Sequence, residues 1–417
     1  MESTTTIIIG AGPAGLAMSR SLTDLGIDHV VLERGEVGNS WKTERWDSLR
    51  LLTPNWMTRL PGFKYNGEDP DGYMTMPEVG QFFDNYADTF DAPIETNTTV
   101  KSVTQSNTGY TVETDRGTWD CTAVVVATGA CSTPRIPDYA SELPSSIVQL
   151  APTQYRNPEQ LPSGGVLVVG ASASGLQLAD EIRRSGREVT LAVGTHTRLP
   201  RHYRGRDMQW WLDATGTLDA RYDEVGDLER ARREPSLQLV GSTDHHTLDL
   251  GILQDSGVRL AGHLGSIDNG VATFADDLGH SVAKADARME RLLDKIDSWA
   301  FINQLTDLPP VARDPKIDVP AGLERLDLEA EGIETVIWAT GFKPHYPWLQ
   351  IPVKNEDGGL IHDGGVLPTP GAYVLGLPFM RRRKSTFIDG AGPDATELAQ
   401  HLAQHVEAVT PALAVAS

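Results

Sequence analysis

The stretch Val166-Leu-Val-Val-Gly-Ala-Ser-Ala-Ser-Gly175 decides the fold class of this 417-residue chain. Four apolar residues, typical of a buried strand, run into a glycine turn, and a helix-like segment follows. This order is typical of a dinucleotide-binding unit, with Ser172 at the middle glycine position of the Gly-x-Gly-x-x-Gly pattern. A complete copy, Ile7-Ile-Ile-Gly-Ala-Gly-Pro-Ala-Gly15, lies about 160 residues upstream. The candidate phosphate-binding residues of the second copy are Gly170, Ser172, Ala173, Ser174 and Gly175.

The N-terminal copy has every part of such a unit. Residues 5–9 predict a buried strand, Gly10 permits the tight turn, Gly12 lets the backbone approach a pyrophosphate, and Gly15 lets the helix pack on the sheet. The helix N-terminus offers free N–H groups to phosphate. The next strand, 29–33, ends in Glu33, whose carboxylate can accept both ribose hydroxyls of an ADP moiety. The predicted ADP-binding residues are Gly10, Gly12, Pro13, Ala14, Gly15, Glu33 and Arg34.

Two nucleotide sites in one chain are typical of flavoproteins that a nicotinamide nucleotide reduces. An aromatic and polar segment, 38–56, directly follows the first site and could reach the flavin. Ser40 and Trp41 are therefore cofactor-binding candidates. Asn55 is the catalytic candidate, because a carboxamide near a flavin edge can donate a hydrogen bond to an oxygen adduct. The alternative for this segment is a structural loop with core tryptophans.

The turn Ala-Thr-Gly occurs twice, at 127–129 and at 339–341, each time after an apolar strand. The duplication predicts that each turn closes one nucleotide-binding half, with Thr128, Gly129 and Gly341 near a cofactor. We therefore expect an α/β fold with two Rossmann-like dinucleotide-binding domains, the NADP domain inserted into the FAD domain. The expected division is 1–157 for the first part of the FAD domain, 158–341 for the NADP domain and 342–417 for the rest of the FAD domain.

The second copy differs from the first in charge. Its second strand, 188–193, ends without an acid, and Arg198, Arg201 and Arg204 follow. Arginines in place of a ribose-binding acid favour the 2′-phosphate of NADP over NAD. The alternative is a solvated basic loop.

Composition excludes several other functions. The formal net charge of −21 argues against a broad nucleic-acid or anionic-membrane surface. No apolar run reaches the roughly 18 residues of a membrane span, and the first glycine pattern begins too early for a signal peptide. Cys121 and Cys131 form neither a disulfide framework nor a Cys-x-x-Cys pair. We expect a cytoplasmic protein with no metal site and no Ser-His-Asp triad, and the sequence leaves a homodimer open as its assembly.

On these motifs the chain resembles the flavin-containing, single-component (group B) monooxygenases of the two-dinucleotide-binding-domain flavoproteins. The resemblance implies that NADPH reduces FAD, that the reduced flavin traps O2 as a C4a-(hydro)peroxide, and that a small organic substrate attacks this adduct. It also implies that an Asn in the loop corresponding to 52–56 supports the adduct, which by position is Asn55. The family motif Phe-x-Gly-x-x-x-His-x-x-x-Tyr is not kept, since its four named positions hold Ser145, Ile147, Ala151 and Tyr155.

Three functions follow as hypotheses. The first is an FAD- and NADPH-dependent monooxygenase that performs N- or S-oxygenation, hydroxylation or a Baeyer–Villiger reaction. The second is a flavin oxidase or dehydrogenase that takes hydride directly from its substrate, suggested by Ala151 at the histidine position of the motif. The third is a non-catalytic NADPH-sensing flavoprotein. A disulfide reductase is disfavoured, because no cysteine pair is spaced to pass electrons from the flavin.

Overall fold

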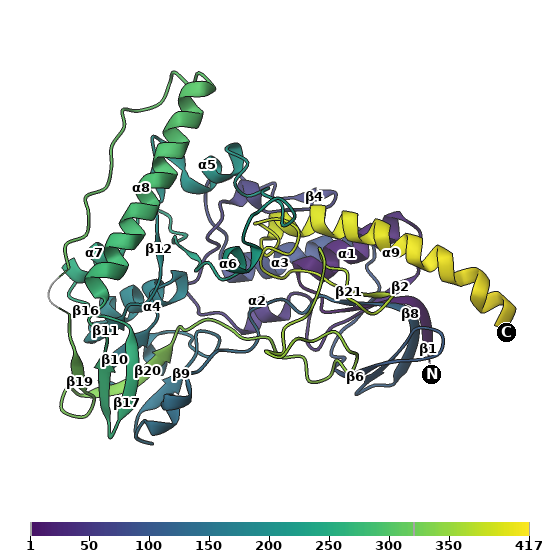
Figure 1. Ribbon diagram of the computed structural model, residues 1–417, viewed down its shortest axis with the longest axis horizontal. Coiled ribbons are helices and arrows are strands. Elements are labelled where there is room, and N and C mark those ends of the chain that lie inside the picture. The colour runs from purple at the N-terminus through teal and green to yellow at the C-terminus, as the bar shows by residue number, and fades with distance from the viewer. Residues whose placement is uncertain (1, 320–321, 417) are drawn as a thin grey trace.

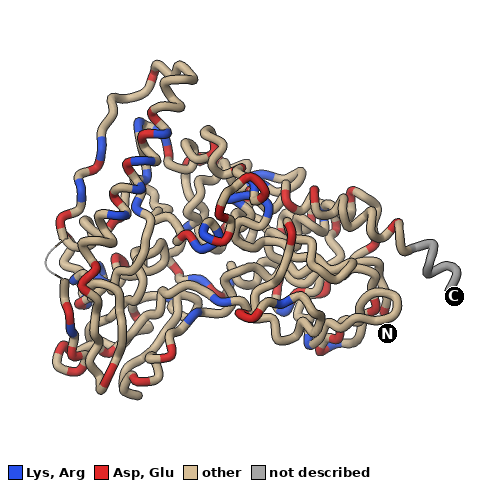
Figure 2. Tube along the Cα trace, in the orientation of Figure 1, with Lys and Arg blue, Asp and Glu red and all other residues tan. Residues whose placement is uncertain are grey.

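The computed structural model describes residues 2–319 and 322–416, with side chains described as far as residue 409. The chain forms two α/β lobes, one built from both ends of the chain and the other from its middle (Figure 1). This arrangement confirms the expected fold class. Among the described residues, no helix combines the length and the apolar character needed to cross a membrane. Figure 2 shows acidic and basic residues interspersed over both lobes.

The first lobe is organised around a mixed sheet with the strand order β5-β2-β1-β8-β7-β6. Strand β21 pairs with the carboxyl end of β8, beyond the part of β8 that pairs with β7. β1 is parallel to both β2 and β8, while β6, β7 and β8 are antiparallel neighbours. The strands are β1 (Glu2–Ile9), β2 (His29–Leu32), β5 (Ile94–Glu95), β6 (Val100–Gln105), β7 (Tyr110–Thr114), β8 (Thr118–Val126) and β21 (Ala372–Val374). Helices α1 (Pro13–Asp24), α3 (Met76–Asp88) and α9 (Ile388–Ala416) pack with this sheet.

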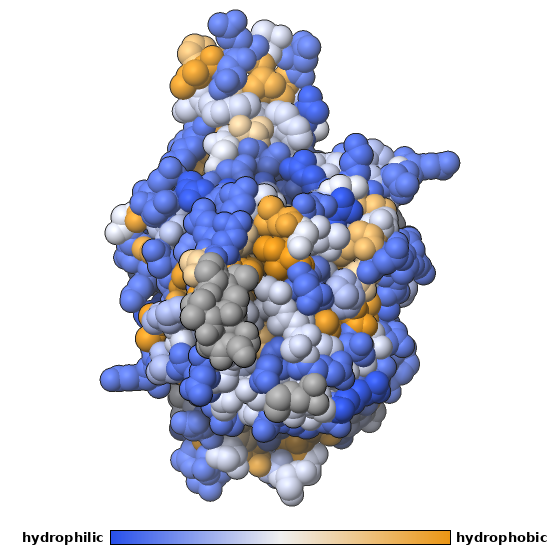
Figure 3. Space-filling view, turned by 90° about the vertical axis from the view of Figure 1, so that its right-hand side faces the viewer, coloured by the Kyte–Doolittle hydropathy of each residue, from blue (hydrophilic) through white to orange (hydrophobic). Residues whose placement is uncertain are grey.

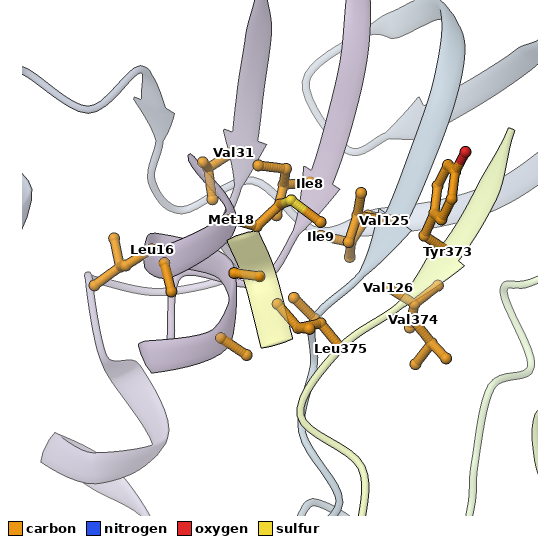
Figure 4. Close-up of a cluster of buried hydrophobic side chains, with 14 of the residues drawn as sticks. Ile8, Ile9, Leu16, Met18, Val31, Val125, Val126, Tyr373, Val374 and Leu375 are labelled. Carbon is orange, nitrogen blue, oxygen red and sulfur yellow. The ribbon is translucent and has the colours of Figure 1, made fainter. Parts of the chain in front are cut away.

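The core of the first lobe explains why these segments become strands. The carboxyl ends of β1 and β8 are continuous apolar runs, as expected for parallel strands that are covered on both faces. Figure 4 shows Ile8 of β1 beside Met18 of α1, with Val125 of β8 and Leu375 completing the same buried cluster. These four side chains are at most 1% exposed.

The second lobe is organised around a parallel sheet with the order β16-β11-β10-β20-β9. Its strands are β9 (Val148–Leu150), β10 (Gly165–Val169), β11 (Val189–Ala192), β16 (Arg259–Ala261) and β20 (Ile333–Trp338), and its helices include α4 (Ala173–Arg184), α7 (Leu250–Asp255) and α8 (Leu278–Ile302). β9 precedes residue 157, where we expected the first domain to end, and yet pairs with β20. The division into domains otherwise stays a prediction.

The two lobes contain the same unit twice. The first unit is β1-α1-β2 and the second unit is β10-α4-β11, and the helix and second strand of the second unit carry numbers 160 higher than their counterparts. Register is also shared, because Ile9 pairs with Leu32 in the first unit and Val169 with Ala192 in the second. A position in one unit therefore has a defined counterpart in the other.

Two linkers cross between the lobes side by side. One follows β8 and the other follows β20, and they meet in an antiparallel bridge between Pro134 and Phe342. The Arg135 N–H donates to the Gly341 carbonyl and the Lys343 N–H donates to the Thr133 carbonyl, both at 2.9 Å. The lobes are thus joined by a hydrogen-bonded double strand of chain.

Helix α8 projects from the second lobe (Figure 1). The helix is amphipathic, and its apolar residues Val282, Met289 and Ile296 are buried. Its last residues, Phe301 and Ile302, are 86% and 74% exposed. Figure 3 shows apolar side chains at this projecting end, at the top of the view.

The last helix and the short elements complete the fold. Helix α9 begins at Ile388, five residues before Pro393, and in its first turn the Gly390 N–H donates to the Phe387 carbonyl. The short elements are α2 (Asn39–Thr43), β3 (Arg59–Leu60), β4 (Phe63–Lys64), β12 (Thr197–Arg198), β13 (His202–Tyr203), β14 (Arg206–Asp207), α5 (Met208–Ala214), α6 (Leu228–Arg232), β15 (Leu237–Gln238), β17 (Leu264–Asp268), β18 (Val271–Phe274), β19 (Arg325–Asp327) and the 3-10 helices at Asn55–Met57, Asp138–Glu142 and Pro158–Gln160.

Alanine substitutions at two glycines of the first unit should differ strongly in their effect on stability. A Cβ at Gly15 would lie 1.8 Å from the Gly10 carbonyl oxygen, whereas a Cβ at Gly12 would meet no atom within 4 Å. We expect Gly15→Ala to lower the free energy of unfolding by about 3 kcal/mol or more, and Gly12→Ala to change it by less than about 1 kcal/mol. Urea unfolding of the cofactor-free protein measures both values, and equal losses would contradict the packing role of Gly15.

Candidate dinucleotide sites

The turn of the first unit is shaped by close backbone approaches. Gly10 has φ +108° and lies so near the Ala127 carbonyl that a Cβ would be 2.7 Å from its oxygen. Gly15 packs against Gly10 itself. Gly12, at the N-cap of α1, faces open space, and Pro13 follows at the first helical position. The space beside Gly12 is thus the only part of this turn, among its three glycines, where a phosphate group could approach.

Glu33 lies at the end of β2, as predicted, and its carboxylate is 7% exposed. One oxygen accepts the Ala11 N–H at 2.8 Å and the other accepts the Gly35 N–H at 3.1 Å. A carboxylate held by two backbone donors keeps a fixed orientation beside the turn. Arg34 points away to an exposed ion pair with Glu44. The contacts therefore favour Glu33, and give Arg34 a surface role.

The segment after the first unit lies between the two lobes. Gly38 is the N-cap of helix α2 and its N–H donates to the Ala11 carbonyl at 2.9 Å, so Ser40 and Trp41 follow directly beside the turn. The Trp41 ring packs edge-on against Phe83 at 5.8 Å. Trp46 is buried in the apolar cluster of the second lobe. The expectation that this segment reaches the flavin, with Ser40 and Trp41 as cofactor-binding residues, stays a prediction.

Gly129 and Gly341 occupy matching places in the two lobes. Each follows a sheet strand, has a positive φ (+74° and +84°) and faces open space where a Cβ would lie. Thr128 is exposed beside Gly129. Ala127 and Ala339, the first residues of the two turns, supply the carbonyls that approach Gly10 and Gly170. The repeated Ala-Thr-Gly turn thus closes each unit on the side opposite its second strand.

The second unit repeats the geometry of the first. Gly170 has φ +105° and a Cβ there would lie 2.4 Å from the Ala339 carbonyl oxygen, while a Cβ at Gly175 would lie 1.8 Å from the Gly170 oxygen. Ser172, at the N-cap of α4, replaces the open glycine with a small hydroxyl side chain, and no side-chain capping bond occupies it. Ala173 and Ser174 begin the helix, with Ser174 half-buried. The serine at position 172 therefore preserves the turn.

Arg198 does not occupy the predicted 2′-phosphate site. Its side chain is 4% exposed and forms ion pairs with Asp249 at 2.8 Å and Asp286 at 2.7 Å, and it also donates to the Pro315 carbonyl. Two buried carboxylates neutralise the guanidinium and use its donors. The prediction for Arg198 is therefore wrong, and the residue ties β12 to α7 and α8.

Arg201 and Arg204 are likewise held by the protein. Arg201 is 1% exposed, pairs with Asp207 at 2.5 Å, donates to the Leu52 carbonyl and lies 4.8 Å over the Tyr73 ring. Arg204 pairs with Asp297 at 3.1 Å and donates to the Pro309 carbonyl. Arg201 therefore joins the two lobes instead of facing a phosphate. The predictions for Arg201 and Arg204 as 2′-phosphate ligands are wrong for the same reason as that for Arg198, because other groups of the chain already bind their guanidinium groups.

Asn55 is buried with its carboxamide committed to the chain. Its oxygen accepts the Met74 N–H at 2.8 Å and its nitrogen donates to the Asp69 carbonyl at 2.9 Å. These bonds hold the 69–74 loop, so one N–H of the carboxamide remains for any other acceptor. The role of Asn55 in supporting an oxygen adduct stays a prediction, beside this structural one.

Gln238 is a residue that the sequence did not single out. It lies in a charged, aperiodic stretch that predicts surface chain, yet it is 1% exposed and its amide donates to the Ala171 carbonyl at 2.6 Å. Its side-chain oxygen is buried without a hydrogen-bond partner. A Cβ placed on Gly241, three residues further along the chain, would lie only 2.1 Å from the Leu51 carbonyl oxygen. This segment therefore crosses the second turn and contacts the first lobe, which only the tertiary fold reveals.

The next features are the possible metal ligands and the two cysteine thiols. No group of three or more His, Cys, Asp or Glu suited to a metal ion occurs in the described part of the chain. Both cysteines are free. Burial raises the pKa of the Cys121 thiol to about 12, and desolvation also raises the pKa of Cys131, against the opposing effect of Arg45. Neither thiol is therefore activated as a nucleophile.

Removal of the Glu33 carboxylate should weaken binding of FAD. Glu33→Ala leaves the N–H groups of Ala11 and Gly35 without their acceptor and deletes the group expected to hold the ribose. We expect the dissociation constant of FAD to rise by about tenfold or more, measured by fluorescence during titration of the apoprotein. Glu36→Ala is the matched control, since Glu36 is 74% exposed. An unchanged FAD affinity in Glu33→Ala would contradict this role.

Removal of Arg198 should destabilise the fold instead of changing nucleotide selectivity. Arg198→Ala leaves Asp249 and Asp286 buried without a counter-charge, which costs about 3–5 kcal/mol. Arg206→Ala is the control, because Arg206 is exposed over the Trp210 ring and its loss leaves stability nearly unchanged. Urea unfolding checks both variants. A stable Arg198→Ala protein that selectively lost affinity for NADPH would restore the original prediction.

Comparison with known proteins agrees with this geometry. A family model described as pyridine nucleotide-disulphide oxidoreductase matches residues 7–215. An uncharacterized CzcO-like oxidoreductase of Geobacillus kaustophilus is 32% identical over 96% of this chain and 98% of the relative. A probable indole-3-pyruvate monooxygenase of Arabidopsis thaliana, YUCCA9, is 29% identical over 48% of this chain and 49% of its own length.

Solved structures show the same fold over nearly the whole chain. A flavin-containing monooxygenase from Stenotrophomonas maltophilia superposes with a TM-score of 0.68 at 18% identity, over 97% of this chain and 99% of that one. The complex of OTEMO with FAD and NADP superposes with a TM-score of 0.56 at 16% identity, over 98% and 86%. The resemblance to flavin monooxygenases is confirmed, and these relatives support FAD and NADPH as cofactors. The chain therefore belongs to the pyridine nucleotide-disulphide oxidoreductase family and is an oxidoreductase with the fold of the flavin-containing monooxygenases.

Proposed function

We propose that this oxidoreductase is an NADPH-dependent monooxygenase that transfers one oxygen atom of O2 to a small organic substrate. The observation that carries the proposal is the pair of matching turns, one in each lobe, each built from glycines too close to backbone for a side chain. Such a pair suits a flavin nucleotide in one lobe and a nicotinamide nucleotide in the other. The monooxygenases among the similar proteins support oxygenation as the reaction type.

The residues of the chain would act by binding and orientation. The N–H groups at the start of α1 and the Glu33 carboxylate hold the ADP half of FAD, and the start of α4 holds the pyrophosphate of NADPH. When bound, FAD supplies the acceptance of hydride and the activation of O2. The segment 38–56 contacts the segment around Gln238, since Gly241 lies against the Leu51 carbonyl, and would by this contact restrict the entry of water. Because both cysteines are free and unactivated, the proposed activity needs no dithiol.

A second function is favoured by one observation in the link between the lobes. Ala151, which stands where the family motif has histidine, is fully buried and its N–H is bound by the Gln154 side chain. Arg156, which follows Ala151 in this link, donates a hydrogen bond to the Arg45 carbonyl at 3.1 Å and so joins the link to the segment 38–56. With no imidazole at this place, a flavin oxidase or dehydrogenase that takes hydride directly from its substrate remains the alternative.

Labelled oxygen separates the two functions. The FAD-loaded protein is supplied with NADPH and ¹⁸O₂ and tested on a thioether, a tertiary amine and a cyclic ketone: methyl phenyl sulfide, N,N-dimethylaniline and cyclohexanone. We expect one ¹⁸O atom in the product and NADPH consumption that rises with substrate. Glu33→Ala without bound FAD is the control. Substrate oxidation without NADPH, with stoichiometric peroxide and no label in the product, would contradict the proposal and support the oxidase.

A further inference from the structure

The loop 69–74 lies between Asn55 and the second lobe. On one side of the loop, the Asn55 carboxamide accepts the Met74 N–H at 2.8 Å and donates to the Asp69 carbonyl at 2.9 Å. The backbone N–H of Asn55 also donates to the Gly72 carbonyl at 2.9 Å. These three hydrogen bonds make the orientation of the Asn55 side chain depend on the conformation of the loop.

Tyr73, the residue before Met74, is held from the opposite side. Its hydroxyl donates to Asp207 at 2.6 Å, and Asp207 ends strand β14 of the second lobe. Tyr73 is 3% exposed, and burial raises the pKa of its phenol, so the hydroxyl keeps its proton. Because a carboxylate only accepts hydrogen bonds, the Tyr73 hydroxyl is the donor in this contact. The loop therefore has one hydrogen-bonded anchor in each lobe.

Arg201 fixes the carboxylate that Tyr73 reaches. Its guanidinium donates to the two Asp207 oxygens, at 2.5 and 3.0 Å, and lies 4.8 Å over the Tyr73 ring. It also donates to the Leu52 carbonyl at 2.9 Å, three residues before Asn55. A bidentate arginine–carboxylate pair has a defined geometry, so the acceptor of the Tyr73 hydroxyl has a fixed position.

His245 contacts the same hydroxyl from another segment of the second lobe. Its Nδ1 lies 3.3 Å from the Tyr73 hydroxyl oxygen, and the two rings are 5.3 Å apart. Since the single hydroxyl proton is donated to Asp207, the His245 Nδ1 carries a hydrogen and donates it to the Tyr73 oxygen. The backbone of His245 has φ +55°, which is uncommon for a residue with a side chain. The second lobe thus holds the Tyr73 hydroxyl through two side chains.

We propose that Tyr73 is a positioning residue that couples the Asn55 carboxamide to the second lobe. Asp207 and His245 hold the hydroxyl, and the backbone passes this constraint to Met74, whose N–H orients the carboxamide. The remaining N–H of the Asn55 carboxamide keeps one direction while the two lobes are in contact. The chemical use of that N–H rests on the proposed function, whereas the coupling between the lobes and Asn55 does not.

Hydrogen exchange in the FAD-loaded protein tests the coupling without turnover. The Met74 N–H exchanges when its bond to Asn55 opens, so its rate reports on that bond. We expect Tyr73→Phe, which removes one hydroxyl, to speed this exchange about tenfold. Tyr86→Phe is the matched control, because the Tyr86 side chain is also buried but its hydroxyl donates within the first lobe, to the Pro61 carbonyl. This control should leave the exchange of Met74 unchanged.

The double variant shows whether Tyr73 acts through Asn55. Asn55→Ala removes the acceptor of the Met74 N–H, and adding Tyr73→Phe to it should speed the exchange no further. Unchanged exchange in Tyr73→Phe would overturn the inference, and so would an additive effect in the double variant. Equal acceleration in Tyr86→Phe would also overturn it, because the first lobe would then have loosened as a whole.

Turnover separates a positioning role from a purely structural one. In the ¹⁸O₂ assay we expect Tyr73→Phe to lower kcat several-fold without a change in KM for NADPH, and Tyr86→Phe to change neither. A wild-type kcat in Tyr73→Phe, despite faster exchange at Met74, would overturn the positioning role. If no product carries ¹⁸O, the monooxygenase proposal fails, while hydrogen exchange still decides the coupling.

Discussion

The structure depends on the contact between a helix start and the turn that precedes it. In both lobes the last glycine of the turn lies so near the first that a single methyl group would overlap a carbonyl oxygen. This contact sets how closely the helix approaches the sheet, and so where the free N–H groups of the helix start point. The same distance recurs at Gly15 and at Gly175, although the two units share little other sequence. Backbone packing thus sets the position of these N–H groups independently of the side chains around them.

Around this constant frame, side chains distinguish the two lobes. In the first, Glu33 accepts the donors beside the turn; in the second, the corresponding residue is Val193, whose side chain has no acceptor. The open glycine of the first turn is a serine in the second, which the N-cap accommodates without strain because its φ is −77°. The two units thus present different groups beside the turn, while their strands keep the same register. The repeat is therefore a direct internal reference for interpreting each site.

The sequence predicted what depends on local geometry. The glycine patterns, Glu33 and the repeated Ala-Thr-Gly turns lie where expected, because each requires only neighbours in the same unit. The prediction that arginines bind the 2′-phosphate was wrong for the opposite reason. The partners of Arg198, Asp249 and Asp286, lie more than fifty residues away in the sequence, and only the folded chain brings them together. Gln238 was missed on the same ground, since nothing in a charged stretch indicates that one amide is buried over a distant turn.

The paired linkers between the lobes have a mechanical consequence. Two chains that run antiparallel and share hydrogen bonds through Gly341 and Thr133 behave as a narrow ribbon instead of as two independent tethers. A ribbon bends easily across its width but resists twisting, because twist would break both bonds at once. The hydrogen bond from Arg201 to the Leu52 carbonyl joins the lobes at a second place, so that the ribbon and this contact together keep the faces of the two lobes opposed.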